Sequence, residues 1–273
     1  MMEPELPIIL KSIDCQKSLS FLVLENWDNL TSKQILWIKP DYVGVMGQVD
    51  KENVIKIHGF DEKKVFPISL PKFDSLRHFD YKQKSQKEEK TLLYVGFSLP
   101  HNEINLLNAL NNRLKNSDLR FNILYRPHPA AKPRLLQEAL HPDIEIVQLE
   151  KKSSLYRLDH LYMADVLKSN LVIGAPTTFM LEVIKLGVPF YIDITDDQVH
   201  RTTSSNSSKN YLHMQQFVSA FNKYVFSDID SLIDLMKKDY FNPMEIEINI
   251  KKFVQSDNMT YASRLRQIID LII

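Results

Sequence analysis

The chain has 273 residues, 44% of them hydrophobic and 25% charged, with 34 lysines and arginines against 34 aspartates and glutamates. This composition is globular, and the zero net charge removes the broad electrostatic basis for binding nucleic acid or an anionic membrane, although a local basic site stays open. The single cysteine has no partner for an internal disulfide, and no apolar run approaches the ~20 residues of a membrane helix. The N-terminus carries acids where a secretory signal carries lysines. We therefore expect a cytoplasmic protein, attached at most peripherally to the inner face of the membrane.

The first 75 residues alternate less regularly than the rest of the chain. Apolar runs predict strands at 20–24, 42–47 and 65–68. Residues 50–59 predict a helix that ends at Gly59. The polar and charged run RHFDYKQKSQKEEK, at 77–90, predicts a linker, with an extended helical surface as the alternative.

From Thr91 onward, short apolar runs alternate with amphipathic stretches. Strands are predicted at 91–95, 120–125, 144–147, 171–174 and 189–192. Helices are predicted at 102–115, 132–140, 156–168, 177–187, 228–238 and 246–272. Repeated β-α units of this kind favour an α/β fold with a parallel, doubly wound sheet. The small polar stretch TTSSNSSKN, at 202–210, lacks the apolar residues of a core and predicts a mobile loop.

Three loops follow predicted strands, at the position where a doubly wound sheet binds its ligands. In the first loop, GFSLPHNE, Gly96 permits a close backbone approach and Ser98 offers a hydroxyl. The start of the following helix favours an anion. A glycine and a serine after a strand are common, so this loop alone identifies no ligand.

The second loop lies in the stretch LYRPHPAAK. Pro127 and Pro129 fix their own φ angles and restrict the residues before them, Arg126 and His128, to extended conformations. The arginine and the histidine would then hang from a stiffened loop, where both suit a phosphate. The alternative is an ordinary turn in which the prolines end the strand and both side chains face water. The residues alone favour neither interpretation.

The third loop lies in GAPTTFMLEVIKLGVP. The hydroxyls of Thr177 and Thr178 meet free backbone amides at a predicted helix start, which again suits a phosphate. Glu182 lies four residues after Thr178 and shares its helical face, where a carboxylate suits the hydroxyls of a ribose. The alternative is a capped helix with a solvated glutamate. Three such loops at successive strand ends together favour a phosphate site.

The stretches YRPHP and LVIGAPTTFMLEVIKLGVP resemble the C-terminal half of GT-B glycosyltransferases that build bacterial surface and capsular polysaccharides. In the sialyltransferases, Kdo transferases and teichoic-acid (CDP-glycerol) polymerases of this kind, a His-Pro motif and a later Ser/Thr pair bind the phosphates of a CMP- or CDP-activated donor. The resemblance implies such phosphate roles for His128, Pro129, Thr177 and Thr178, and a ribose contact for Glu182. Threonine here replaces the first serine of the usual pair.

The resemblance extends to ENWDNLTSKQ, at 25–34, and to residues 39–74, which are similar to the end of the N-terminal GT-B domain. It implies that Asp28 and Asn29 face the cleft from the acceptor side, with Asp28 as the candidate catalytic base. Trp27 is expected to pack rather than to stack on a sugar. About 75 residues precede the linker, against roughly 100–200 in a typical domain. The chain is then either a shortened homologue or one that a partner polypeptide completes.

The predicted organisation is an acceptor-side segment, a linker, a Rossmann-type donor-binding domain and C-terminal helices that pack back on the N-terminal part, at 1–76, 77–90, 91–235 and 236–273. The resemblance implies metal-independent transfer of a glycosyl or polyol-phosphate group from a CMP-, CDP- or UDP-activated donor to a glycan or lipid-linked acceptor, with no tightly bound cofactor. Two alternatives stay open. One is a non-catalytic nucleotide-binding or assembly subunit that lacks a full acceptor domain, and the other is a nucleotide-sugar epimerase-like GT-B enzyme.

Other chemistries find no support in the sequence. A zinc site needs cysteines and histidines clustered at ligand spacing. The histidines are instead scattered and are expected on the surface or in helix packing, at His58, His78, His101, His141, His160, His200 and His213. No nucleophile elbow and no Walker loop occurs.

Overall fold

The computed structural model describes residues 6–15, 18–28, 31–32, 36, 38–79, 90–98, 102–128, 139–147 and 160–273. The chain divides into two compact units. Unit 1 comprises Met1–His78, Tyr211–His213 and Met244–Ile273, and unit 2 comprises Phe79–Asn210 and Met214–Pro243. None of the described helices has the length and apolar character needed to cross a membrane. The predicted linker falls mainly on residues 80–89, which lie outside the described ones.

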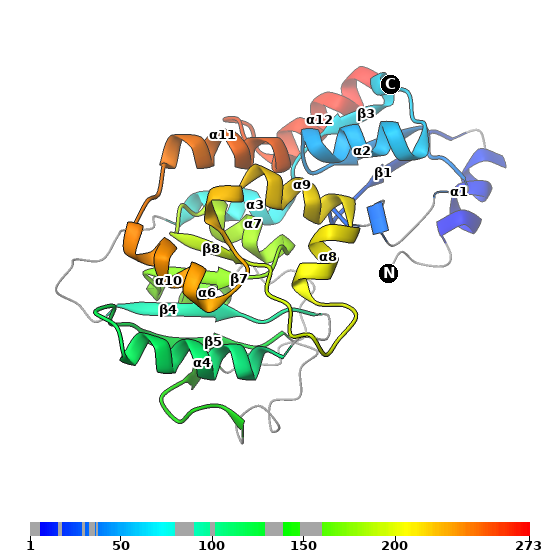
Figure 1. Ribbon diagram of the computed structural model, residues 1–273. Helices are drawn as coiled ribbons and strands as arrows, with labels where there is room; N and C mark the ends of the chain where they lie inside the picture. Colours follow the sequence, from blue (N-terminus) through cyan, green and yellow to red (C-terminus); the bar gives the residue numbers. More distant parts are fainter. Residues whose placement is uncertain are drawn as a thin grey trace. The chain divides into compact units, whose positions relative to one another are not determined.

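Unit 2 is built on a six-stranded parallel sheet (Figure 1). Its strands are β4 (Thr91–Val95), β5 (Asn122–Arg126), β6 (Glu145–Ile146), β7 (Leu171–Gly174), β8 (Phe190–Asp193) and β9 (Val225–Phe226). They lie in the order β6-β5-β4-β7-β8-β9, and each neighbouring pair is parallel. Strands covered on both faces consist of nearly continuous apolar residues, and all four residues of β7 and of β8 are buried. The predicted doubly wound α/β fold is confirmed.

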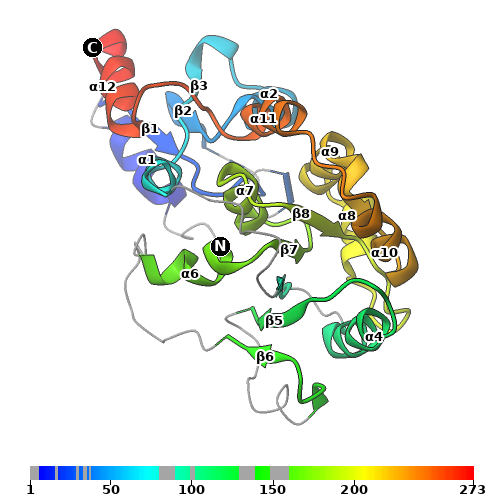
Figure 2. The ribbon, with the colours of Figure 1, turned by 90° about the vertical axis from the view of Figure 1, so that its left-hand side faces the viewer.

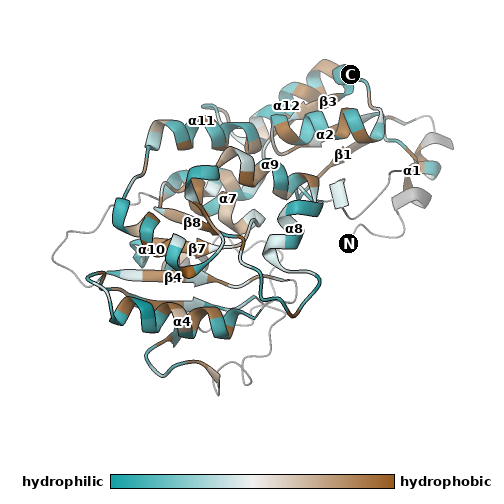
Figure 3. Ribbon diagram, viewed as in Figure 1, coloured by the Kyte–Doolittle hydropathy of each residue, from teal (hydrophilic) through white to brown (hydrophobic). Residues whose placement is uncertain are grey.

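Helices cover both faces of this sheet. They are α4 (Glu103–Lys115), α6 (His160–Lys168), α7 (Thr178–Lys185), α8 (Ser204–Asn210), α9 (Leu212–Ala220) and α10 (Ile229–Lys238). Figure 2 shows α6 and α7 on one side of the strands and α4 and α10 on the other. Figure 3 shows hydrophobic and hydrophilic residues alternating along α4. The apolar stripe of this helix packs inward, and Leu107, Leu110 and Leu114 are at most 3% exposed. The helix predicted at 132–140 falls mainly outside the described residues.

The serine-rich stretch 202–210 differs from its prediction. Residues Ser204–Asn210 form α8, and four of its serines are at most 8% exposed: Ser204, Ser205, Ser207 and Ser208. The hydroxyl of Ser204 donates to the carbonyl of Thr195 at 3.0 Å. The prediction of a mobile loop is wrong, because small side chains allow a helix to pack closely and a hydroxyl offers its own hydrogen bond to buried backbone.

Unit 1 contains a smaller parallel sheet, in the order β1-β2-β3. Its elements are α1 (Leu6–Cys15), β1 (Phe21–Val23), β2 (Tyr42–Val45), α2 (Gln48–His58), β3 (Val65–Pro67), α3 (Pro71–Ser75), α11 (Pro243–Phe253) and α12 (Tyr261–Ile272). The helix predicted at 50–59 is confirmed, and it ends at Gly59 with a left-handed φ of 61°. The helices predicted within 246–272 are α11 and α12, which residues 254–260 separate.

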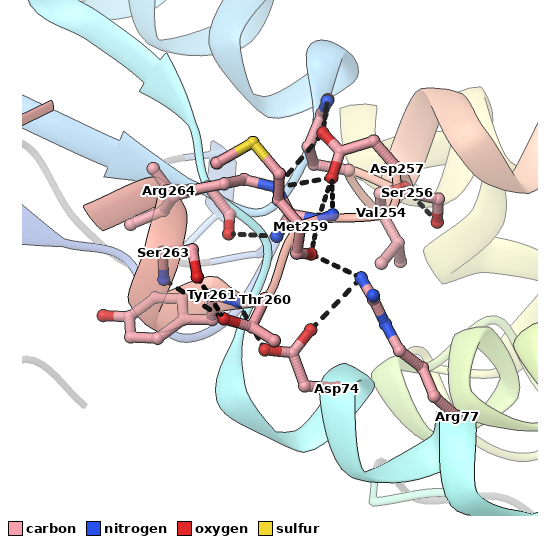
Figure 4. A network of polar contacts seen from close by, with 12 residues as sticks. Asp74, Arg77, Val254, Ser256, Asp257, Met259, Thr260, Tyr261, Ser263 and Arg264 are labelled. Carbon is pink, nitrogen blue, oxygen red and sulfur yellow. Dashed lines mark hydrogen bonds and ion pairs between the residues drawn. The ribbon is translucent and has the colours of Figure 1, made fainter. Parts of the chain in front are cut away.

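The C-terminal residues of unit 1 are tied to its sheet. The amide of Gln255 donates to the carbonyl of Met46 at 2.9 Å, and a Cβ at Gly47 would collide with the carbonyl of Phe253. Figure 4 shows Arg264, on α12, within a network of polar contacts. Its guanidinium pairs with Asp257 at 2.7 Å and donates to the Ile68 carbonyl at 3.1 Å.

Candidate functional site

The strand order of unit 2 places three loops at one edge of the sheet. From β4 the chain proceeds to β5 and β6 on one side, and it then crosses to β7, β8 and β9 on the other. Val95 is paired with both Arg126 and Gly174, so the loops after β4, β5 and β7 begin at the same level. A doubly wound sheet binds its ligands at such a reversal of strand order, beyond the carboxyl ends of the strands. The three loops singled out in the sequence therefore share the edge where this fold favours a ligand.

Gly96 is the point at which the loop after β4 meets the loop after β5. Its amide donates to the Arg126 carbonyl at 2.8 Å. A Cβ at Gly96 would lie 2.7 Å from the backbone nitrogen of His128 and 2.9 Å from Oε2 of Glu103. The protein's own backbone therefore requires glycine here, and contact of Gly96 with a ligand stays a prediction. Ser98, in the same loop, is exposed.

Hydrogen bonds from buried tyrosines to buried carboxylates stabilise these loops. Glu103, 8% exposed, accepts from the Phe97 amide at 2.5 Å and from the Tyr125 hydroxyl. The Tyr94 hydroxyl donates to Asp193 at 2.7 Å. Burial raises the pKa of Tyr94 well above its usual value, and the nearby Asp193 and Glu103 charges add to this, so the phenol keeps its proton and remains a donor. The sequence offers little sign of these pairs, because up to 99 residues separate the partners.

Arg126 differs from the expectation that it hangs from a loop. It is the last residue of β5, and it is only 6% exposed. Its Nη1 contacts both carboxylate oxygens of Asp165, on α6, at 3.0 and 3.1 Å, and its guanidinium lies 4.5 Å from the centre of the Phe179 ring. The strand continues one residue beyond the predicted end and carries the arginine into the sheet. Its phosphate role stays a prediction, now with Asp165 as a competing anion.

His128 lies two residues after the end of β5. Its side chain is half-buried, and this burial lowers the pKa of His128 from its usual value. The imidazole is therefore neutral at physiological pH, and one ring nitrogen donates while the other accepts. Pro127, between Arg126 and His128, is buried. Two other predicted site residues, Pro129 and Asn29, lie outside the described residues.

The loop after β7 leads into the start of α7, as expected. Thr177 is the N-cap, with φ −137° and ψ 164°, and its hydroxyl accepts from the Met180 amide at 3.4 Å. Thr178 is the first helical residue, and the first backbone N–H groups of a helix have no acceptor within it, which favours an anion there. Glu182 lies one turn further but is only 5% exposed. Its predicted ribose contact is not tested by this arrangement.

Asp28 belongs to unit 1, which is described separately. Its carbonyl accepts from the amides of Thr31 and Ser32 at 3.3 and 3.1 Å. The neighbouring Trp27 is 4% exposed, and its ring centre lies 5.1 Å from that of His213. The expected packing role of Trp27 is therefore confirmed. The role of Asp28 as a catalytic base stays a prediction.

Comparisons with known proteins identify the type of fold. No protein-family model and no curated protein sequence matches the chain. Among solved structures, the wall teichoic acid polymerase TagF matches with a TM-score of 0.50 and 15% identity, over 90% of this chain and 59% of that one. A UDP-GlcNAc 2-epimerase from Neisseria meningitidis, bound to UDP-GlcNAc, matches with a TM-score of 0.53 and 13% identity, over 96% and 72%. The chain has a GT-B-type fold.

A third solved structure gives the same result. It is a Listeria monocytogenes protein assigned as a UDP-N-acetylglucosamine 2-epimerase, with a TM-score of 0.57 and 15% identity, over 96% of this chain and 70% of that one. At these identities the likeness shows the GT-B fold and leaves the donor and the reaction open. The chain spans about six-tenths of the polymerase's length, since it covers 59% of it.

Proposed function

We propose that unit 2 binds the phosphates of a nucleotide-activated donor, and that the protein transfers a glycosyl or polyol-phosphate group from it to a surface-polysaccharide acceptor. One observation supports this most strongly: three loops begin level with one another at the reversal of strand order, through the pairing of Val95 with Arg126 and Gly174. The GT-B fold is compatible with it. One structure of TagF was soaked with CDPG, and the Neisseria epimerase is bound to UDP-GlcNAc.

The chemistry of this proposal is electrostatic. Transfer leaves negative charge on the departing phosphate, and preformed hydrogen-bond donors stabilise it. The backbone N–H groups at the start of α7, the hydroxyls of Thr177 and Thr178, and the neutral imidazole of His128 are the donors that we assign. Gly96 allows the His128 loop to lie against the loop of Ser98. Because the chain itself supplies these donors, the proposal includes no bound metal or cofactor.

Arg126 and Glu182 receive supporting roles. Arg126 is paired with Asp165, so we assign it the role of fixing the end of β5. Direct contact with a phosphate requires Arg126 to give up its hydrogen bonds to Asp165. Glu182 is buried within α7, and we assign it a ribose contact only as the resemblance implies.

A nucleotide-sugar epimerase is the second candidate. The two epimerase structures match over 70% and 72% of their own lengths, against 59% for the polymerase. An epimerase changes its nucleotide sugar without an acceptor, whereas a transferase releases nucleotide faster when its acceptor is present. Turnover of UDP-N-acetylglucosamine with and without added glycan acceptor separates the two reactions.

Calorimetric titration with CMP, CDP, UDP and GDP tests the donor site. We expect at least one of these nucleotides to bind, and His128→Ala to weaken its binding by about 10-fold, as is usual for a hydrogen bond to a charged group. His141→Ala is the matched control, because His141 precedes β6 at the amino edge of the sheet. Binding of none of the four would contradict the donor site. Binding that His128→Ala leaves unchanged would remove the His-Pro loop from it.

A further inference from the structure

The loop between β8 and α8 is organised around a buried carboxylate. The side chain of Asp197 is 4% exposed. Its Oδ1 accepts from the amides of Val199 at 3.0 Å and His200 at 2.9 Å, and its Oδ2 accepts from the Asn102 amide at 2.9 Å. Burial opposes ionisation, but the hydrogen bonds from His200, Val199 and Asn102 outweigh it and hold the pKa of Asp197 well below its usual range. Asp197 is therefore a fixed negative charge.

This carboxylate orients one histidine ring. Nδ1 of His200 lies 2.6 Å from Oδ2 of Asp197, so this nitrogen carries the proton in the neutral ring and Nε2 is left as the acceptor. The His200 side chain is 42% exposed, and in the described part of the chain no hydrogen bond or ion pair engages its Nε2. Gln198 supports the turn in a left-handed conformation with φ 55°, a strained conformation that the surrounding contacts maintain.

A series of contacts joins this pair to the candidate phosphate site. Asn102, which donates to Asp197, is the N-cap of α4. The next residue, Glu103, lies against Gly96, and Gly96 lies against the backbone of His128. The loop of His200 also follows the carboxyl end of β8, at the same edge of the sheet. His200 is therefore part of the edge where the three loops converge.

We propose that Asp197 and His200 form the acid–base dyad of the transfer, a role that rests on the proposed function. Nε2 of His200 takes the proton of the attacking acceptor hydroxyl. The acceptor oxygen then bonds to the transferred group, the bond from that group to the donor phosphate breaks, and its electron pair leaves with the nucleotide. The Asp197 carboxylate stabilises the imidazolium that forms. This proposal gives the base role to His200 in place of Asp28.

Turnover of UDP-N-acetylglucosamine and CDP-glycerol, measured as released nucleotide, tests the dyad. For His200→Gln we expect UDP and CDP to bind as in the wild type and kcat to fall about 100-fold. Asp197→Asn should also lower kcat relative to the wild type. The matched control is His141→Gln, because His141 also faces an aspartate, with Nδ1 3.8 Å from Asp143, but precedes β6 at the amino edge. An unchanged kcat in His200→Gln would overturn the proposal.

A second measurement needs no turnover. Diethyl pyrocarbonate modifies unprotonated histidine nitrogens, and mass spectrometry reports the site. We expect saturating UDP or CDP to protect His200 and not His141. A nucleotide that binds by calorimetry without protecting His200 would overturn the dyad and leave the donor site intact. Absence of all nucleotide binding would contradict the proposed function and the dyad together.

Discussion

Asp50 and Asp197 are both buried acids, yet their protonation differs. Asp50, in the first turn of α2, is 7% exposed. Burial raises the pKa of Asp50 to about 8, Asp28 adds to the shift, and a hydrogen bond from the Met46 backbone offsets only part of it. Asp197 has several donors around its oxygens, and the pKa of its carboxyl falls. Deeper burial of Asp50 and the larger number of hydrogen-bond donors around Asp197 together decide which of the two acids is charged at neutral pH.

The raised pKa of Asp50 predicts that the protein loses stability as the pH rises. The folded-state pKa of about 8 lies above the ordinary carboxyl value of 3.8, so the contribution of Asp50 is fully present below pH ~4 and is lost between pH ~4 and ~8. Asp50→Asn removes this loss, and its stability relative to the wild type should grow by up to about 1.4 kcal/mol per pH unit. Scanning calorimetry at pH 5, 6, 7 and 8 measures it.

The control for Asp50 is Asp270→Asn, since the Asp270 side chain is 70% exposed. Its stability difference from the wild type should not vary over the same range. A difference for Asp50→Asn that is equally flat would contradict a protonated Asp50.

The buried pair of Arg126 and Asp165 gives a second prediction. The two side chains are 7% and 9% exposed, so Asp165→Asn leaves a buried guanidinium without its counter-charge, which costs about 3–5 kcal/mol. The matched control is Asp230→Asn, which breaks an exposed pair with Arg113 at 3.0 Å and should cost less than about 1 kcal/mol. Urea unfolding, followed by tryptophan fluorescence and circular dichroism, compares the free energies of unfolding of the two variants. Equal losses would show that the Arg126 pair is not the stronger one.

At the scale of elements, one buried arginine contributes strongly to the attachment of α12. Arg264 is 5% exposed, and it donates to the carbonyls of Ile68 and Met259 at 3.1 and 2.7 Å as well as to Asp257 (Figure 4). The carbonyl of Met259 also accepts from Arg77 at 2.6 Å. Hydrogen bonds from Arg264 hold the pKa of Asp257 well below its usual range. A single side chain thus connects α12 to the end of β3.

Arg264→Ala should therefore release α12. The carbonyls of Ile68 and Met259 and the carboxylate of Asp257 lose their hydrogen bonds from Arg264, and we expect unit 1 to lose about 3 kcal/mol of stability. Arg266→Ala is the control on the same helix, because the Arg266 side chain is 85% exposed and lies 3.9 Å from Asp270. Hydrogen exchange of the α12 amides reports the difference. Unchanged protection in Arg264→Ala would contradict this attachment.

Helices and strands were predictable from the sequence where apolar residues recurred at the helical period or formed a continuous run. The strand at 91–95 has the predicted bounds, and α4 begins one residue later than predicted. α8 was not predictable, since burial of serines depends on what packs against them. The same limit applies to the site. The capping position of Thr177 follows from local sequence, but Asp165 lies 39 residues from Arg126 and only the fold brings them together.

At the scale of the whole molecule, the doubly wound topology followed from the alternation of strands and helices, and it placed the three loops at one edge of the sheet before any contact was known. The dyad did not follow from the sequence. Asp197 and His200 are only three residues apart, but nothing in DQVH indicates that the aspartate is buried against the start of α4. Tertiary packing, rather than local pattern, creates that part of the site.

The central claim is that this edge of unit 2 binds nucleotide phosphate. Its most direct test is a titration of the ¹⁵N-labelled protein with CDP and with UDP, following the backbone amides by NMR. We predict that the amides of Gly96, His128 and Thr178 shift together on binding, while that of Asn170, which precedes β7 at the opposite edge, stays in place. Shifts confined to the opposite edge, or no shift at saturating concentrations of either nucleotide, would contradict the account.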